Sequence, residues 1–228
     1  MTKNNIDRTK QMVLRNYKLN KREITEAIYW IILGDGCIEK ALRGNYRLAV
    51  SHKSSHEDYL LWKASIIDQV TSWSVNPQNG SGYSPDKSEY LRLRSSAHPW
   101  FTRAYDRIYA PLNRKSIDPH ALKLLSPLGL SILYQDDGSY HYSLDAGHNI
   151  LIHKLCFSKF ELEALAKTIV DKFGIIFRVN RVKNKGLGYR LRMRASDKEK
   201  FFDLIDSYIV PSMLYKVGKG STSSEVVI

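Results

Sequence analysis

The chain has 228 residues, 43% of them hydrophobic and 25% charged, which is a normal balance for a globular protein with an ample core. Thirty-five Lys and Arg against 23 Asp and Glu give a net charge of +12, which indicates a polyanionic partner such as nucleic acid, with plain solubility as the alternative. Cys37 and Cys156 lie in apolar, strand-like segments and are expected to be reduced core residues. With no secretory signal and no apolar run of the ~20 residues that span a membrane, we expect a soluble intracellular protein.

Residues 1–19 show little hydrophobic periodicity, and we expect a loosely attached basic arm or plain disorder. Its basic side chains are Lys3, Arg8, Lys10, Arg15 and Lys18.

The next segment predicts a buried helix that ends on an acid and a glycine. Asn20, with Glu23 three residues later, has the pattern of a capping box, and Gly36 is expected to stop the helix. Asp35 would then sit at the negative end of the helix dipole, where an anion is disfavoured by roughly 0.3–1 kcal/mol. We infer that something positive binds there.

Alternating polar and apolar residues from Cys37 to Lys53, around the turn Arg43-Gly44-Asn45, predict a hairpin. Glu57 to Val70 has apolar residues at helical spacing. A second strand pair follows, interrupted by the turn-rich stretch 76–87, and residues 99–109 predict another helix. The order is therefore helix, two strands, helix, two strands, helix.

The same order recurs after residue 125. Ser126 and Pro127 begin a second buried helix, which ends on Asp136, Asp137 and Gly138. The offsets agree, since 137 − 35 is 102, 192 − 92 is 100 and 216 − 115 is 101. The sequence thus predicts an internal duplication and a pseudo-two-fold axis through the two helices. The predicted segments are an arm at 1–19, halves at 20–118 and 119–217, and a tail at 218–228.

Residues 28–36, Ile-Tyr-Trp-Ile-Ile-Leu-Gly-Asp-Gly, and residues 130–138, Leu-Ser-Ile-Leu-Tyr-Gln-Asp-Asp-Gly, resemble the two signature motifs of the LAGLIDADG homing endonucleases. The surroundings, including residues 209–216, resemble the monomeric two-motif I-SceI type. The resemblance implies an α+β fold, a duplicated αββαββα arrangement with two pseudo-symmetric halves. Tyr29 and Trp30 depart from the small residues that the signature prefers, and we expect Ser131 to compensate.

The resemblance implies that Asp35 and Asp137 bind metal at the active centre. Two adjacent carboxylates favour a divalent cation, and oxygen ligands favour Mg²⁺, with Mn²⁺ as a substitute. Gly34 and Asp136 complete the predicted metal site, Asp136 by shaping it or through its backbone carbonyl. The resemblance also assigns Lys115 and Lys216 to the active centre, where they would polarise the attacking water or neutralise phosphate charge.

DNA binding is expected from the strands, because alternate residues of a strand share one face and a two-stranded ribbon fits the major groove. The target would be a long, weakly palindromic double-stranded site. The predicted DNA-binding residues are Arg43, Arg47, Lys53, Arg92, Arg94, Arg178, Arg181, Lys183, Lys185, Arg190, Arg192 and Arg194.

The leading interpretation is a site-specific, intron-encoded type of DNA endonuclease that acts as a monomeric pseudo-dimer. The alternatives are an RNA maturase that assists intron splicing and a catalytically dead DNA-binding regulator. The compartment would be an organelle if the gene is organellar, and otherwise the bacterial cytoplasm. His52 and His56 have the i, i+4 spacing of metal ligands, but a plain surface role is favoured because no Glu or Cys supports a site.

Overall fold

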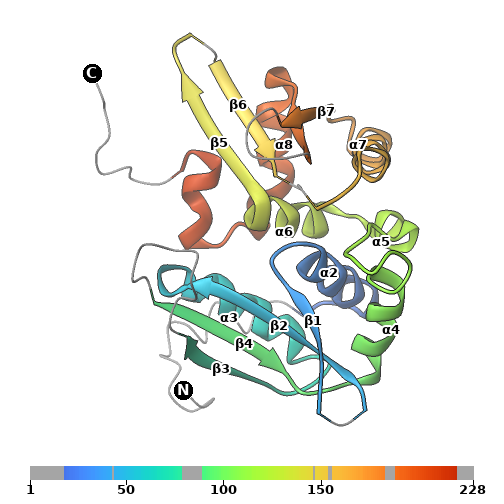
Figure 1. The fold of residues 1–228 in the computed structure, drawn as a ribbon. Coiled ribbons are helices and arrows are strands. Elements are labelled where there is room, and N and C mark those ends of the chain that lie inside the picture. The colour runs from blue at the N-terminus through green and yellow to red at the C-terminus, as the bar shows by residue number, and fades with distance from the viewer. Residues whose placement is uncertain are drawn as a thin grey trace. The chain divides into compact units, whose positions relative to one another are not determined.

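The computed structural model describes residues 18–42, 44–78, 89–145, 147–153, 156–182 and 188–219. Helices and two four-stranded antiparallel sheets form two compact units, which divide after Ile132 (Figure 1). Most of the predicted arm, most of the tail, and Arg43, Lys183 and Lys185 lie outside the described residues. Among the described residues, no helix is long and apolar enough to cross a membrane.

The first unit contains the predicted order of helix, two strands, helix, two strands and helix, which is confirmed. The division after Ile132 comes later than the predicted end of the first half at residue 118, because α5 packs with α2. Its elements are α2 (Lys21–Leu33), β1 (Cys37–Lys40), β2 (Tyr46–Lys53), η2 (Ser54–His56), α3 (Glu57–Ile67), β3 (Trp73–Gln78), β4 (Tyr90–Ser95), α4 (Pro99–Ile108) and α5 (Pro119–Leu124).

The second unit repeats this order, and α6 runs across the division into it. The strand orders β1-β2-β4-β3 and β5-β6-β8-β7 are the same in the two sheets, as a duplication requires. Its elements are α6 (Pro127–Asp137), β5 (Gly138–Ser143), β6 (Gly147–Ile152), α7 (Lys159–Phe173), β7 (Phe177–Val182), β8 (Gly188–Met193), η3 (Ala195–Asp197), α8 (Lys198–Ile205), η4 (Asp206–Tyr208) and η5 (Pro211–Val217).

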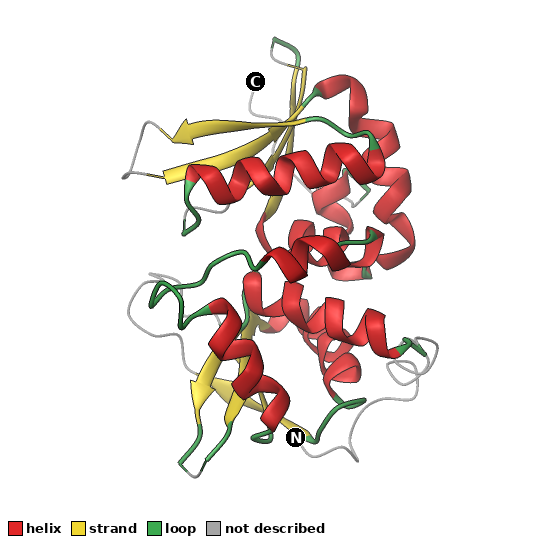
Figure 2. Ribbon diagram, turned by 90° about the vertical axis from the view of Figure 1, so that its right-hand side faces the viewer, coloured by secondary structure: helices red, strands yellow, loops and turns green. Residues whose placement is uncertain are grey.

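In each unit, helices cover one face of the sheet (Figure 2). In the first unit, α3 and α4 pack on the face that carries Leu48, Val50 and Leu93, which are at most 1% exposed. Alternation along the strands therefore leaves the other face to polar side chains. In the second unit, α7 packs on β7 and β8.

The helix that carries the first motif begins as predicted. The Asn20 side chain accepts hydrogen bonds from the amides of Arg22 and Glu23, and Glu23 returns one to the Asn20 amide, which forms the capping box. Residues 26 to 33 of α2 are all buried. The C-terminal two turns of the helix therefore lie within the protein, whereas its first residues are at the surface.

Gly138 directly follows the last residue of α6, as predicted, whereas α2 already ends at Leu33 with Gly34 as its cap, which corrects the stop predicted at Gly36. Neither Gly36 nor Gly138 has a positive φ. Each is required by close approach instead, because a Cβ on Gly36 would lie 2.6 Å from the carbonyl oxygen of Ile31, and one on Gly138 would overlap Tyr134. The turn that carries each motif acid is thus packed directly against the preceding helix.

The start of α6 packs on α2 through Gly129. A Cβ at Gly129 would overlap the side chains of Glu26 and Trp30, so this glycine makes the room that Trp30 needs. Tyr29 points elsewhere, and its ring makes edge contacts with Trp100 and His120. The two large residues of the first motif are therefore accommodated by different neighbours.

Glu26 holds the start of α6. Its side chain is 1% exposed, and its Oε1 accepts hydrogen bonds from the amides of Ser126 at 2.5 Å and Gly129 at 3.0 Å. The first amides of a helix have no partner within the helix, and they attract an anion. Glu26 satisfies both needs from a neighbouring helix.

We expect Glu26→Ala to lower the free energy of unfolding by about 3–5 kcal/mol, because it leaves two buried amides unpaired and opens a cavity. Glu26→Gln keeps an acceptor oxygen and should cost about 1–2 kcal/mol, through loss of the charge at the helix start. Urea denaturation followed by circular dichroism measures both. Equal losses for the two variants would contradict the assignment.

Two sequence predictions for the cysteines have different outcomes. Cys37 lies in β1 and is half-buried, whereas Cys156 is exposed and lies outside any strand. The prediction that Cys156 is a core residue is therefore wrong. The absence of a disulfide between the two described cysteines agrees with the prediction.

Candidate functional site

In the first unit, the motif acid stands in the turn that follows α2. The helix ends at Leu33, Gly34 is its cap, and the Asp35 side chain remains 38% exposed. The Lys115 ammonium donates to the carbonyl oxygens of Gly34 at 2.8 Å and Gly36 at 2.6 Å, on either side of Asp35. An accessible carboxylate and a fixed ammonium thus share one turn.

Lys115 reaches this turn from the loop after α4. The amide and the hydroxyl of Ser116 both donate to the carbonyl oxygen of Ile108 at 2.9 Å, which ties the loop to the end of that helix. The Arg114 guanidinium donates to the carbonyl oxygen of Lys115 at 2.7 Å. The ammonium is therefore positioned by anchored backbone on both sides.

The second unit has the corresponding arrangement. The Lys216 ammonium donates to the carbonyl oxygens of Gln135 at 2.6 Å and Asp136 at 3.2 Å. The Gln135 side chain is fully buried, accepts a hydrogen bond from the Val210 amide at 3.0 Å and donates to the carbonyl oxygen of Tyr208 at 3.1 Å. Gln135 thereby anchors the segment that leads to Lys216.

The two lysines provide the positive charge that was expected at the helix ends. The last carbonyls of a helix carry the negative end of its dipole and have no partner within the helix. Lys115 and Lys216 supply both the charge and the donors. The position of the acids at the helix ends is therefore no argument for a metal by itself, because part of the compensation comes from the protein.

Two ways of aligning the repeats give different counterparts of Asp35 in the second unit. The lysines differ by 216 − 115, or 101, and adding 101 to Asp35 leads to Asp136. An acid directly before a glycine occurs at Asp35 and Asp137, which differ by 102. Asp136 and Asp137 are both half-buried at the end of α6. The choice between them is a matter for experiment.

His52 is a residue whose role the sequence analysis missed. The preferred surface role is wrong, because His52 is 7% exposed on the inner face of the sheet, where it continues the alternation of Leu48 and Val50. Its Nδ1 lies 3.9 Å from the Asp35 carboxylate. The same alternation could have revealed its burial.

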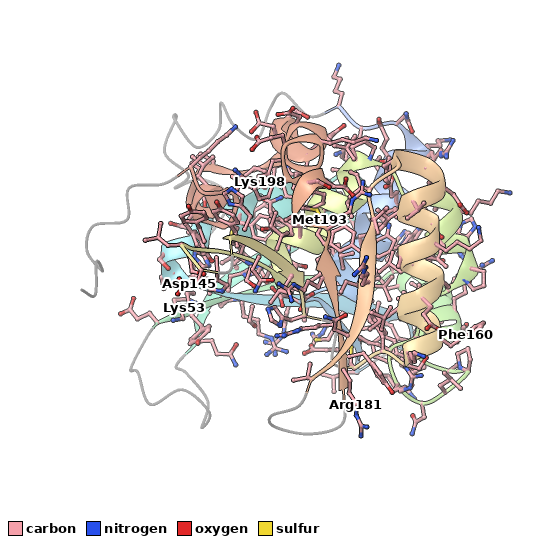
Figure 3. The ribbon with its side chains drawn as sticks, turned by 90° about the horizontal axis from the view of Figure 1, so that it is seen from above. Lys53, Asp145, Phe160, Arg181, Met193 and Lys198 are labelled. Atoms are coloured by element: carbon pink, nitrogen blue, oxygen red, sulfur yellow. The ribbon has the colours of Figure 1, made fainter. Side chains whose placement is uncertain are left out.

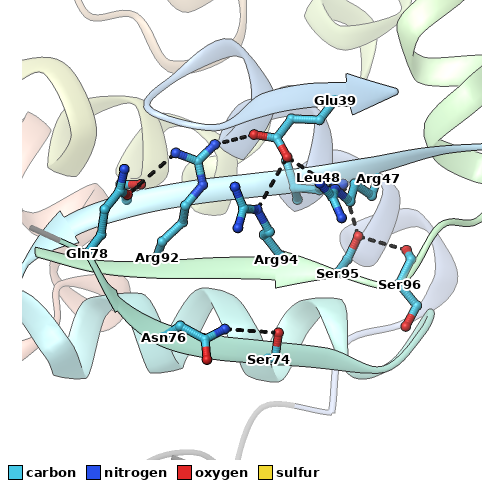
Figure 4. A network of polar contacts seen from close by, with 11 residues as sticks. Glu39, Arg47, Leu48, Ser74, Asn76, Gln78, Arg92, Arg94, Ser95 and Ser96 are labelled. Atoms are coloured by element: carbon cyan, nitrogen blue, oxygen red, sulfur yellow. Dashed lines mark hydrogen bonds and ion pairs between the residues drawn. The ribbon is translucent and has the colours of Figure 1, made fainter. Parts of the chain in front are cut away.

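The outer face of the first sheet carries three of the predicted basic residues, joined by an acid (Figure 4). The Glu39 carboxylate accepts from Nε of Arg47 at 3.1 Å, from Nε of Arg94 at 3.4 Å and from Arg92. Cross-strand pairing puts Glu39 opposite Arg47 in the ladder, which accounts for the contact. Burial would raise the pKa of Glu39, but the Arg92 and Arg94 guanidiniums hold it below its usual value. Lys53 is exposed at the end of β2.

The second sheet carries a similar but smaller basic row. Arg192 stands opposite Arg178, and Arg190 stands opposite Asn180 on the same face. Arg181 has the opposite parity, is exposed, and extends away from its strand (Figure 3). Arg194 lies beyond β8, and its guanidinium pairs with Asp197 at 2.6 Å, so it does not continue the predicted stripe.

The comparison with known families identifies the family to which this fold belongs. Residues 25–201 match the model of the LAGLIDADG DNA endonuclease family, which covers more than half of the chain. The chain belongs to this family.

Curated relatives include both endonucleases and maturases. The chain is 30% identical to the probable intron-encoded DNA endonuclease 3 of Mycosarcoma maydis over 55% of the chain and 90% of that protein. It is 25% identical to the cytochrome b mRNA maturase bI2 of Debaryomyces hansenii over 86% of the chain and 74% of that protein. It also matches the RecA protein of Mycobacterium gastri at 24% identity, and spans half the length of that relative.

Among solved structures, the homing endonuclease I-WcaI bound to its DNA recognition sequence is similar at a TM-score of 0.71, with 20% identity and 93% of each chain covered. This likeness confirms the α+β fold with duplicated halves that was predicted. The predicted monomeric type, with two motifs in one chain, fits this likeness.

Proposed function

We propose that this protein is a site-specific endonuclease that cleaves both strands of DNA by hydrolysing phosphodiesters with a divalent metal. The observation that carries the proposal is the repeated turn, in which a motif acid adjoins carbonyls held by a lysine ammonium, in a chain of the LAGLIDADG DNA endonuclease family. Each half would cleave one strand, so the chain would act as a pseudo-dimer.

The donor set of the two turns suits Mg²⁺, because its side-chain ligands are carboxylate oxygens and no cysteine is present. Asp35 in the first unit and Asp137 in the second would each serve as a metal ligand, with Asp136 as the competing ligand in the second unit. The carbonyl oxygen of Gly34 accepts a hydrogen bond from the Lys115 ammonium and has a second lone pair that would be available to the ion. When bound, such an ion lowers the pKa of an attacking water and stabilises a leaving oxygen.

Lys115 and Lys216 would act on the phosphate. Each ammonium is held by two carbonyls, which leaves its position set before DNA arrives. A preorganised cation at the point where negative charge develops lowers the barrier without reorganisation during the reaction. The basic faces of the two sheets, with Arg47, Arg92 and Arg94 in the first, would hold the duplex.

The second candidate is an RNA maturase, which the name of the relative from Debaryomyces hansenii suggests. A maturase would use the same basic faces but would not need Asp35 and Asp137. Retention of both acids favours the nuclease.

The test is cleavage of a supercoiled plasmid that carries the uninterrupted sequence flanking the coding region of this chain. We expect linear product with Mg²⁺ or Mn²⁺, and binding without cleavage with Ca²⁺. Failure to cleave with any of these ions, combined with tight binding of the flanking intron RNA, would reject the nuclease in favour of the maturase.

Glu39→Gln is expected to increase non-specific DNA affinity. In the native chain, one carboxylate offsets part of the charge of Arg47, Arg92 and Arg94. Its removal adds one unit of positive charge to the proposed DNA-binding face. A plot of the logarithm of the binding constant against the logarithm of salt concentration should therefore have a slope that is steeper than that of the native chain by about 0.9. Fluorescence anisotropy of labelled duplex across salt concentrations measures this slope.

The matched control is Glu163→Gln, which makes the same charge change on α7, where Glu163 pairs with Lys159. It should leave the slope nearly unchanged. An equal effect of the two variants would mean that net charge alone, and not the outer face of the first sheet, governs binding.

A further inference from the structure

The first unit contains a buried lysine that the proposed chemistry does not use. Lys63 lies on α3, and its side chain is 0% exposed. Its Nζ stands 3.0 Å from Nε2 of His52 and 4.3 Å from the centre of the Tyr59 ring. Burial of a cation is costly unless it is paired, and the face of an aromatic ring attracts a cation. The His52 nitrogen and the Tyr59 ring face are therefore partners of the buried Lys63 amine.

The contact between Lys63 and His52 determines which nitrogen of the histidine carries the proton. With Lys63 as an ammonium, which has donors and no acceptor, Nε2 of His52 accepts from it. In a neutral imidazole one nitrogen accepts and the other carries the hydrogen. Nδ1 is therefore the N–H donor, and Nδ1 is the atom that faces the Asp35 carboxylate at 3.9 Å.

This arrangement disfavours His52 as a metal ligand. A histidine binds a metal through a nitrogen with a free lone pair. The lone pair of Nε2 is occupied by Lys63, and Nδ1 carries hydrogen. An N–H that faces a carboxylate orients that carboxylate instead. The separation of 3.9 Å is longer than a hydrogen bond, and active-site contacts of this kind commonly tighten when the substrate complex forms.

The second unit has neither the lysine nor a histidine at this strand position, because the residue opposite Leu191 is Ile152, whereas His52 stands opposite Leu91 in the first unit. Nε2 of His153 lies 3.0 Å from the hydroxyl of Ser139, which can donate or accept and therefore leaves the tautomer open. The positions 101 and 102 residues after Lys63 hold Ala164 and Leu165 on α7. The two halves thus differ at the strand position that holds His52 in the first unit, and the nearby His153 has a different partner.

We propose that Lys63 and His52 are positioning residues that orient the Asp35 carboxylate through the tautomer of His52, and that this makes the two halves cleave their strands at different rates. The proposal rests on the endonuclease function proposed above. It assigns no direct contact with DNA or metal to either residue. The partners of a metal-binding carboxylate typically contribute 10–100-fold to affinity or activity.

The first test is the tautomer itself, read from the ¹⁵N chemical shifts of the imidazole in long-range ¹H–¹⁵N spectra of the native chain without metal or DNA. We expect protonated Nδ1 and unprotonated Nε2 for His52, and a shift towards the other tautomer in Lys63→Met. The His52→Asn chain assigns the signals. A protonated Nε2 in the native chain would overturn the proposal, whatever the chain does to DNA.

The second test is cleavage of a duplex with a different fluorophore on each strand, at saturating enzyme, so that the rates refer to the bound complex. Lys63→Met should change the ratio of the two strand rates by about 10-fold, with little change in DNA affinity. His52→Asn, which places an amide N–H where Nδ1 stands, should keep more of the native ratio than His52→Phe.

The control is Lys167→Met, which removes one charge from an exposed residue of α7 that pairs with Asp171. It should leave the ratio unchanged. If Lys63 had only a structural role, Lys63→Met would slow cleavage of both strands equally and lower the melting temperature. Replacing a buried cation by an apolar side chain of similar volume is often neutral or stabilising, so we expect the Lys63→Met chain to fold. An unchanged ratio in a folded Lys63→Met chain would reject the proposal.

Discussion

Asp137→Asn is expected to bind target DNA with nearly native affinity and to lose double-strand cleavage by about 10³-fold, as is Asp35→Asn. Asparagine has the shape of aspartate but no negative charge, so it binds a divalent cation more weakly and does not neutralise the charge of that cation. Loss of one preorganised electrostatic group at a reaction centre typically costs 10²–10³-fold. Plasmid cleavage with Mg²⁺, resolved into nicked and linear product, measures the loss, and gel shift with Ca²⁺ measures binding.

The informative control is Asp136→Asn. The spacing between the lysines pairs Asp136 with Asp35, whereas the acid before the glycine is Asp137. If Asp137 is the metal ligand, Asp136→Asn should retain cleavage within about one order of magnitude. If the two variants exchange these behaviours, the assignment of the second acid moves to Asp136, and the lysine spacing becomes the better guide to the repeat.

Lys115→Met should lower the rate of cleavage by about 10²-fold at saturating DNA, through loss of the ammonium beside the first acid. Met keeps the length of the side chain but cannot donate to the carbonyls of Gly34 and Gly36, which Lys115 contacts at 2.8 and 2.6 Å. Single-turnover kinetics separate this loss from any change in binding. Thermal denaturation reports how much the turn itself depends on the lysine.

Lys216→Met tests the second half in the same way, and Lys123→Met on α5 removes a lysine that lies on neither sheet nor motif turn. The Lys123 variant should cleave at a nearly native rate. If Lys115→Met and Lys216→Met bind DNA less tightly but cleave normally once bound, the lysines contact the backbone of DNA and play no part in the chemical step.

Most of the secondary structure could be predicted from local patterns. The capping box at Asn20 lies within four residues of chain, and the strands and helices follow from spacings of two and of three to four residues. The duplication was visible because the repeated residues keep offsets of 100 to 102. Family membership followed from two short motifs and is confirmed.

The partners of the functional side chains could not be predicted in the same way. Glu39 and Arg92 are 53 residues apart, and their contact depends on the pairing of β1 with β2 and of β2 with β4. The charge pattern predicted only a basic face, because a single acid such as Glu39 forms no repeating pattern that would show which arginines it contacts. The helix stop predicted at Gly36 was wrong, because α2 is already capped at Gly34 and Gly36 is needed where backbones approach closely.

The sequence by itself determined the duplicated α+β architecture, the two motif acids and the basic strands, because each is written in residues that are neighbours along the chain. Only the tertiary structure decided that Lys115 closes the turn around Asp35 from 81 and 79 residues away, and that Lys63 fixes a histidine beside it. The physical reason is burial. The carbonyls at the end of a buried helix and a lysine under a sheet must find partners inside the protein, and packing determines which side chains are within reach.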